Sequence, residues 1–532
     1  MNKVAIIVTI IKNIEFSENG VMIMHVSEAL AINATRHPNK LIFACEGREY
    51  TYRQFNEEVN RMAHGLLALG YKKGDKIGIF MKNSDHFMLA FLAIVRAGFV
   101  AVPINFRLTS TETSYILEQS EAKAVFCDDV FEEIVVGASE KTERTHDIIV
   151  QPVATYTGSV DWATVRTDDT SYPRVLVTGA DDAEILYTSG TTGYPKGALF
   201  DHQTVVNVHI SYTLCLTLTS EHRALCIAPL FHSAQLNGMT LTAIYLGMFT
   251  VIHRDFNPEA VLADIEKYKL SAFFGVPAMY TALLQVPNKE RYDLSTIDKC
   301  MYGAAPMAPA LIESAMQLFG TRSFYNFCGM TEAGPGGVFL KPEEHDTKLG
   351  AGGKAMFLYN TRVVDDEMND VAPGEIGEFI MRGATIMKEY YRKPEETQKT
   401  FRDGWLMTGD LATIDEDGYI TVVDRKKDMI ISGGENVYSV EVEQVLNSHP
   451  HILEAATIGL PDERWGESVT AVIVVKPNVK IDEQELIAFC REHIASYKIP
   501  RKFLYEDALP RNASGKILKY QLRDEYIKAQ VE

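Results

Sequence analysis

Hydrophobic residues in the first part of the chain recur with two different spacings. A helical spacing predicts helices over 26–36, 52–69, 87–98 and 111–119, and short apolar runs predict strands over 41–44, 48–51, 75–80, 100–103 and 124–126. Helices and strands therefore alternate, which is typical of a parallel sheet in an α/β layer. Residues 128–182 are polar and poorly periodic, and we expect a surface excursion there.

The same rhythm continues beyond residue 182 and changes near residue 350. Predicted helices cover 202–216 and 256–268, and predicted strands cover 184–187, 197–200, 224–229, 272–277 and 299–306. Short strands with Asp/Gly turns then predict a small β-subdomain over 350–424. The helix–strand rhythm resumes after Asp424, where Ser439 is the expected N-cap of a helix with Glu441 and Glu443 in its first turn. We therefore divide the chain into an extension (1–21), a large domain (22–424) and a small α+β domain (425–532).

The loop between the predicted strands 184–187 and 197–200 carries an unusual concentration of polar groups. Glycines let backbone N–H groups converge on an anion, hydroxyls add donors, and a lysine adds positive charge, so the loop is suited to polyphosphate. An ordinary polar turn is the alternative, and the common P-loop is excluded because no Gly-Lys-Ser/Thr opens a helix here. The phosphate-binding candidates are Thr188, Ser189, Gly190, Thr191, Thr192, Gly193 and Lys196.

Charge and cysteine content narrow the class of protein. The net charge of −19 argues against a nucleic-acid partner, and the seven cysteines contain no Cys-x-x-Cys pair, as expected for a reduced cytoplasmic protein. The apolar run 4–11 is too short to cross a bilayer, so no transmembrane segment is predicted. We interpret residues 1–21 as a dispensable extension, with a weak membrane tether as the alternative.

Several motifs occur in a fixed order over residues 25–525. The segment Ser189–Gly197 resembles the phosphate loop of the adenylate-forming superfamily, which includes acyl-CoA synthetases, peptide-synthetase adenylation domains and firefly-type luciferases. The motifs that follow this loop also occur in an order similar to the one found in that family. These are Pro229–Ser233, Gly303–Pro306, Asn326–Glu332, Trp405–Asp410, Asp424–Asn436 and Pro510–Lys519.

The resemblance implies roles for residues around ATP and the acid. Thr188 and Glu332 match the Mg²⁺-holding positions, and oxygen ligands suit that ion. His232 matches the residue near the reacting carboxylate. Cys328 stands where the family usually has a tyrosine against adenine, and Phe327 could compensate from the next position. The implied nucleotide-binding residues are Gly303, Ala304, Ala305, Asn326, Phe327, Cys328, Gly329, Met330 and Thr331.

The last motifs imply a mobile second domain. Asp410 matches the ribose-binding carboxylate with Arg425 as its partner, and Lys427 matches a hinge. Gly433 and Gly434 would approach the site for the reaction with CoA. Lys516 matches the lysine that serves acyl-adenylate formation, and Lys516, Glu332, His232 and Thr188 are the implied catalytic residues.

The resemblance thus implies an ATP-, Mg²⁺- and CoA-dependent acyl-CoA ligase that proceeds through an acyl-adenylate. A medium- or long-chain fatty acid is the favoured substrate, with the apolar run 236–252 as an acyl tunnel or as plain core. The alternatives are an aryl-acid ligase of the coumarate/ferulate type and an adenylation enzyme that loads a carrier protein. Peripheral membrane contact and oligomerisation stay open.

Overall fold

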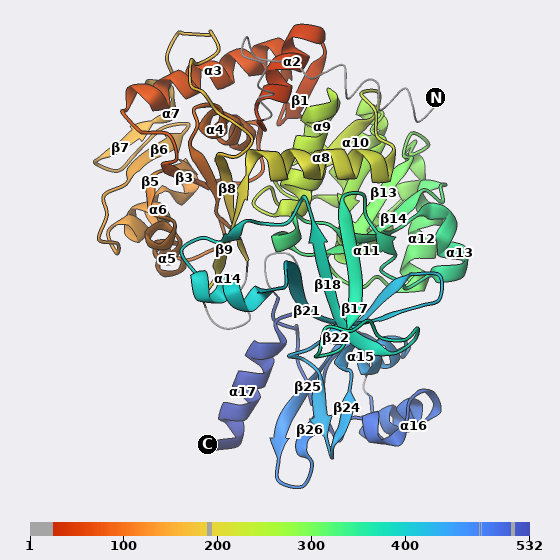
Figure 1. The fold of residues 1–532 in the computed structure, drawn as a ribbon. Helices are drawn as coiled ribbons and strands as arrows, with labels where there is room; N and C mark the ends of the chain where they lie inside the picture. The colour runs from red at the N-terminus through yellow and green to blue at the C-terminus, as the bar shows by residue number, and fades with distance from the viewer. Residues whose placement is uncertain (1–24, 189–193, 478, 480, 512–516, 532) are drawn as a thin grey trace.

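The computed structural model describes residues 25–188, 194–477, 479, 481–511 and 517–531 (Figure 1). A large body contains two mixed sheets, a β-subdomain lies below it, and the C-terminal domain forms the lower lobe. This arrangement agrees with the predicted large α/β domain followed by a small α+β domain.

The first large sheet has nine strands and is parallel through its centre. Parallel ladders join the strands from β14 to β1, while β2, β15 and β16 pair antiparallel at the edges. The strand order is β16 (Lys354–Ala355), β15 (Gly337–Leu340), β14 (Phe324–Gly329), β13 (Lys299–Gly303), β12 (Ala272–Gly275), β10 (Arg223–Cys226), β11 (Phe249–Ile252), β1 (Leu41–Cys45) and β2 (Arg48–Thr51).

The second large sheet has eight strands and includes part of the segment that we expected to be a surface excursion. That expectation for 128–182 was wrong, because β6 and β7 extend the parallel ladder beyond β5 and bury Ile149 and Val150. The strand order is β19 (Glu389–Tyr390), β9 (Lys196–Asp201), β8 (Asp182–Thr188), β4 (Val100–Pro103), β3 (Lys76–Phe80), β5 (Ala122–Asp128), β6 (Asp147–Gln151) and β7 (Ser159–Asp161).

Helices packed between the two sheets form the main core. Helix α4 is buried at every position except His86, and it contacts β3 and β4 of one sheet and β1 of the other. Its Arg96 is buried too, and the guanidinium donates to Ser27 and to the side-chain oxygens of Asn56 and Asn60. The inner helices are α2 (Glu28–Arg36), α3 (Tyr52–Ala68), α4 (Asp85–Arg96), α8 (His202–Leu216), the π-helix η2 (Ala234–Leu241) and α9 (Thr242–Leu246).

The outer faces of both sheets are also covered by helices. Separate apolar clusters form beneath α10, α11 and α12 on the nine-stranded sheet and beneath α5 and α6 on the eight-stranded sheet. Their bounds are α10 (Pro258–Tyr268), α11 (Pro277–Leu284), α12 (Pro309–Phe319), α5 (Ser110–Ser120) and α6 (Glu132–Ser139). Shorter helices are η1 (Asp129–Phe131), α7 (Trp162–Val165), η3 (Lys289–Arg291), η4 (Thr331–Ala333), η5 (Pro342–Glu344), α13 (His345–Lys348) and α14 (Pro394–Thr400).

The predicted β-subdomain is present as a five-stranded antiparallel sheet. Its last strand pairs with β21, which brings Asp410 opposite Arg425. The strand order is β17 (Tyr359–Val364), β18 (Ile376–Gly383), β21 (Trp405–Ile414) and β20 (Phe401–Arg402), with β22 (Ile420–Arg425) on β21.

The C-terminal domain is a five-stranded sheet with helices on both faces. Helices α15 and α16 cover one face, and α17 packs on β25 at the other. The elements are β23 (Ile430–Ser432), β24 (Glu435–Val437), α15 (Ser439–Asn447), β25 (Ile452–Asp462), β26 (Gly466–Val475), α16 (Glu483–His493), η6 (Ser496–Lys498), β27 (Lys502–Tyr505) and α17 (Lys519–Val531).

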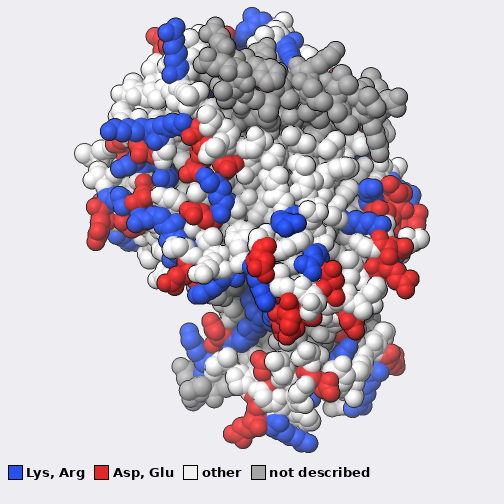
Figure 2. Space-filling model, viewed as in Figure 1, with Lys and Arg blue, Asp and Glu red and all other residues white. Residues whose placement is uncertain are grey.

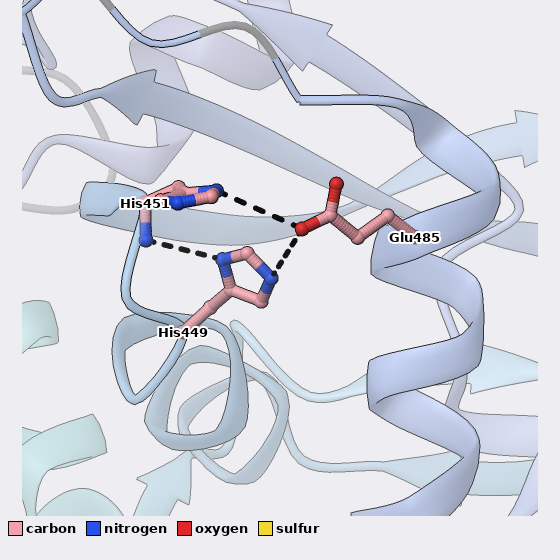
Figure 3. A group of neighbouring side chains, drawn as sticks. All are labelled: His449, His451 and Glu485. Atoms are coloured by element: carbon pink, nitrogen blue, oxygen red, sulfur yellow. Dashed lines mark hydrogen bonds and ion pairs between the residues drawn. The ribbon is translucent and has the colours of Figure 1, made fainter.

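Two imidazoles and a carboxylate join α16 to the turn between α15 and β25 (Figure 3). The Nε2 atom of His449 lies 3.4 Å from Oε1 of Glu485, and Nδ1 of His451 lies 3.6 Å from the same oxygen. The backbone N–H of His451 donates to Nδ1 of His449. Because that nitrogen is an acceptor, Nε2 of the neutral imidazole carries the proton and donates to Glu485. The group therefore fastens α16 to the domain.

Ser439 does not cap α15 as expected. The helix begins at Ser439 itself, and its hydroxyl and backbone N–H both donate to the carboxylate of Asp424. Lys519 donates to the same hydroxyl at 2.6 Å and pairs with Glu443 at 2.6 Å. The residue at the predicted domain boundary is therefore bound to the first helix of the C-terminal domain.

Candidate active site

A cavity of about 1010 Å³ lies where the large domain meets the start of the C-terminal domain. Its walls come from the ends of β8, β9, β10 and β14, which is where open α/β sheets place ligands. Figure 2 shows basic and acidic side chains side by side at this junction. The basic lining residues from this region are Lys399, Arg425, Lys426 and Lys427.

The described ends of the predicted phosphate loop lie at this cavity. The two ends of this loop, Thr188 and Lys196, both line the cavity, and they lie on two strands as expected, which pair antiparallel. The ammonium of Lys196 lies 4.3 Å from the centre of the Tyr390 ring and 3.7 Å from a carboxylate oxygen of Glu396. Ser189, Gly190, Thr191, Thr192 and Gly193 lie outside the described residues.

Glu332 is held at the same end of the cavity. Its side chain is buried, and the hydroxyl of Tyr390 donates to Oε1 at 2.6 Å. The hydroxyl of Ser233 donates to that of the preceding Thr331 at 3.4 Å, which links the His232 turn to the Glu332 turn. Both Thr188 and Glu332 offer oxygen atoms at one cavity, and such ligands fit Mg²⁺.

Tyr390 was missed by the sequence reasoning. Its ring contacts Lys196 and its hydroxyl contacts Glu332, so it joins the two charged candidates. Strand β19 places it there by pairing with β9. A two-residue strand leaves no hydrophobic period, and no local sequence signal marks this tyrosine.

His232 lines the cavity beyond the end of β10. Desolvation, with a smaller effect of Arg107, lowers the pKa of its imidazole to about 4, so the ring is neutral near pH 7. Its buried Nε2 atom has no hydrogen-bond partner among the described residues. A neutral imidazole at this position can donate or accept one hydrogen bond toward a carboxyl group.

The end of the adjacent strand pair β13–β14 forms another wall. Gly303 lies opposite Phe327, and a Cβ atom at residue 303 would lie 2.3 Å from the Phe327 carbonyl oxygen, so only glycine fits. Gly303, Ala305, Asn326 and Cys328 are not among the lining residues. The predicted residues of this region that line the cavity are Ala304, Phe327, Gly329, Met330 and Thr331.

Phe327 stacks on another aromatic ring rather than standing alone in the cavity. Its ring centre lies 5.0 Å from that of Tyr212, with 8° between the planes, and 6.0 Å from that of Phe339. Tyr212 also lines the cavity and was missed by the sequence reasoning. Cys328 faces the other way, toward Gly352.

The apolar run 236–252 is core. Its residues in η2, α9 and β11 are largely buried, and none of them lines the cavity. The structure therefore supports plain core for this run and does not support the alternative of an acyl tunnel.

The remaining candidates lie around the domain junction. Asp410 and Arg425 form an ion pair at 3.3 Å, and Arg425 and Lys427 line the cavity. Partial desolvation, assisted by Arg425, lowers the pKa of Lys427 to about 8. Gly433 and Gly434 lie in the β23–β24 turn, outside the cavity lining, and Lys516 lies outside the described residues.

No helix in the described part of the chain is both long and apolar enough to span a bilayer. The predicted absence of a transmembrane segment agrees with this observation for those residues.

Comparisons with known proteins identify the family of this chain. The model of the AMP-binding enzyme family matches residues 30–391, and that of the AMP-binding enzyme C-terminal domain matches residues 441–516. A feruloyl-CoA synthase of Amycolatopsis is 38% identical over 479 residues, 90% of this chain and 94% of that protein. The long-chain-fatty-acid–CoA ligase FadD13 of Mycobacterium tuberculosis is 35% identical over 485 residues, 90% of this chain and 93% of that protein.

A solved structure shows the same architecture with a reaction intermediate bound. The o-succinylbenzoate CoA synthetase MenE of Bacillus subtilis, in complex with the acyl-adenylate OSB-AMP, superposes with a TM-score of 0.83 and 31% identity, covering 93% of this chain and 98% of that one. The chain belongs to the adenylate-forming AMP-binding superfamily and is an AMP-forming acid–CoA ligase.

Proposed function

We propose that this ligase activates an apolar carboxylic acid with ATP and then transfers the acyl group to CoA. The observation that carries the proposal is one cavity whose lining combines the polar and charged groups of Thr188, Lys196 and Glu332 with His232 and with apolar side chains. The acid carboxylate attacks the α-phosphorus of ATP, pyrophosphate leaves, and the CoA thiol then displaces AMP from the acyl-adenylate.

The first step brings two anions together, the acid carboxylate and ATP. The charged side chains of the cavity can reduce the repulsion between them. Lys196 supplies positive charge next to the phosphate loop. Thr188 and Glu332 would hold Mg²⁺, which neutralises phosphate charge when bound. The neutral imidazole of His232 would orient the attacking carboxylate by a hydrogen bond. A cation at this position would instead form an ion pair with the negative charge of the carboxylate.

Residues at the domain junction would serve the nucleoside and the second step. Asp410, oriented by Arg425, would accept hydrogen bonds from the ribose hydroxyls. Lys516 would stabilise the charge that builds between carboxylate and α-phosphate, and rotation about Lys427 would bring Gly433 and Gly434 to the site for CoA. These roles follow the family motifs.

Two classes of acid are candidates. FadD13 is a long-chain-fatty-acid–CoA ligase, which supports the fatty acid favoured by the sequence, and the feruloyl-CoA synthase supports an aryl acid. The apolar lining residues Ile227, Ala228, Val276, Ala278 and Met279 suit either class.

The test is pyrophosphate release by the full chain, measured with and without CoA over a panel of acids from acetate to oleate plus cinnamates. We expect acid- and CoA-dependent turnover and an acyl-CoA product. Adenylation without thioester formation would instead support an enzyme that loads a carrier protein, and no release with any acid would refute the ligase reaction.

A further inference from the structure

We propose that the stacked rings of Tyr212 and Phe327 form a fixed wall of the acid pocket, which takes Phe327 away from the adenine contact that the family motifs imply, so that the enzyme prefers acids with a compact apolar body over extended alkyl chains. This inference rests on the proposed function. It selects between the two substrate classes by the shape of the acid that can enter.

The two rings lie face to face at the cavity surface. Their centres are 5.0 Å apart with nearly parallel planes, and each side chain is largely buried, Tyr212 at 4% and Phe327 at 6% exposure. Both belong to the main apolar core, and Phe339 stacks behind Phe327. Each ring therefore presents only a small surface to the cavity and is supported from behind.

Tyr212 is also confined from the side of η2. A Cβ atom at Gly238 would lie 2.8 Å from Cζ of Tyr212, so the tyrosine ring occupies the space above this glycine. The neighbouring Asn237 donates its side-chain N–H to the carboxylate of Glu184 in β8 at 2.6 Å, which fixes η2 against the sheet. Tyr212 thus lies between Phe327 and an anchored backbone, and close-packed cores yield little to such displacement.

The region behind the wall offers no path for a long chain. Leu236, Met239 and Leu241 of η2 are at most 2% exposed, and none of them lines the cavity. The lining of the cavity also includes the short side chains of Ala228, Ala234 and Ala278, which leave room for a compact group. A single ring or a short alkyl chain needs no space beyond the two rings, whereas an extended chain that continues toward η2 must displace Tyr212 or Phe327.

The experiment compares kcat/KM, from CoA-dependent pyrophosphate release, for straight-chain acids from butyrate to palmitate and for cinnamate. We expect the native enzyme to favour the compact acids by at least tenfold over palmitate, since a few methylene groups without space already exceed this ratio. Tyr212→Ala and Phe327→Ala should each raise the palmitate-to-butyrate ratio at least tenfold. Tyr212→Leu and Phe327→Leu are milder versions that protect the test against misfolding.

Tyr212→Phe is the matched control, because it keeps the ring and should keep the native preference. Two results would overturn the proposed wall. One is an equal kcat/KM for palmitate and butyrate in the native enzyme, and the other is an unchanged palmitate-to-butyrate ratio in folded Ala and Leu variants of Tyr212 and Phe327. A native enzyme that releases pyrophosphate with none of the acids would overturn the ligase reaction instead, so the two failures are distinguishable.

Discussion

At the residue scale, Tyr390 connects two charged residues of the proposed nucleotide site, Lys196 and Glu332. Its hydroxyl donates to Glu332 and its ring lies under the ammonium of Lys196. One side chain thereby orients a carboxylate and supports a cation, and it reaches both from a strand nearly two hundred residues beyond the phosphate loop. Glu332 needs such support because a buried carboxylate requires hydrogen bonds.

We predict that Glu332→Gln lowers the rate of acyl-adenylate formation by 10²–10³-fold, on the order of the loss of one stabilising group, and raises the Mg²⁺ concentration needed for half-maximal rate. Tyr390→Phe removes only the supporting hydrogen bond, worth about 1 kcal/mol, and should cost roughly fivefold. Pyrophosphate release titrated with Mg²⁺ measures both variants. Glu396→Gln is the control, and a native Mg²⁺ dependence in Glu332→Gln would contradict the assignment.

The resemblance to the family's motifs predicted cavity-lining residues that lie at or just beyond strand ends, such as Thr188, His232 and Glu332. Tyr212 and Tyr390 could not be predicted in this way. Each reaches the cavity through tertiary packing, Tyr212 from the middle of a buried helix and Tyr390 from a two-residue strand. Such contacts depend on partners distant in the sequence.

At the scale of elements, the hydrophobic pattern predicted the long helices and short apolar strands such as β2 and β4, but it missed β6 and β7. The helix predicted from 52 to 69 is α3, whose start is fixed by a capping box between Thr51 and Gln54. In contrast, β6 and β7 have five and three residues in a polar setting. These strands join the sheet because β6 pairs with the edge of β5 and β7 pairs with β6. The local sequence of β6 and β7 does not show that this pairing partner exists.

Thr51→Ala tests the contribution of this capping box. Its loss should cost about 1 kcal/mol in the local stability of α3. The amides of the first turn should then exchange with solvent about fivefold faster in hydrogen-exchange measurements. Thr51→Ser keeps the hydroxyl and should exchange at the native rate, and unchanged exchange in Thr51→Ala would show that tertiary packing alone holds the helix start.

At the scale of the whole molecule, buried imidazoles couple the fold to pH. Desolvation is the largest cause that lowers the pKa of His25 and His209 to about 3 and of His202 and His232 to about 4. In the unfolded chain these groups would titrate near 6.5. The folded protein therefore binds fewer protons than the unfolded chain, and stability falls as pH drops below about 6.5.

We predict a loss of about 2 kcal/mol per such histidine between pH 7 and pH 5, which a lowered urea midpoint would report. His209→Phe should reduce this pH dependence, because His209 is buried and its ring nitrogens have no partners among the described residues. The exposed His37→Gln serves as control. A urea midpoint of the native protein that is constant from pH 7 to pH 5 would show that the imidazoles become hydrated.

Alternation between two arrangements of the C-terminal domain predicts opposite defects for two lysines. Lys516→Ala should slow acyl-adenylate formation on the order of 10²–10³-fold. It should spare thioester formation from pre-made acyl-adenylate and CoA. Lys427→Pro should spare the first step and slow the second, because the ring restricts the hinge backbone. Equal slowing of both steps by Lys516→Ala would exclude alternation for this enzyme.

The three tryptophans of the chain are distributed one to each structural unit. Trp162 lies in the large body, Trp405 in the β-subdomain and Trp465 in the C-terminal domain, where it packs over Gly433 and beneath the guanidinium of Arg501 at 4.3 Å. Indole emission depends on such contacts, so the protein contains its own fluorescent reporter of the Gly433–Gly434 turn. In a Trp162→Phe/Trp405→Phe variant, the emission of Trp465 should shift when CoA is added to the acyl-adenylate complex. Constant emission during thioester formation would place the turn away from the second half-reaction.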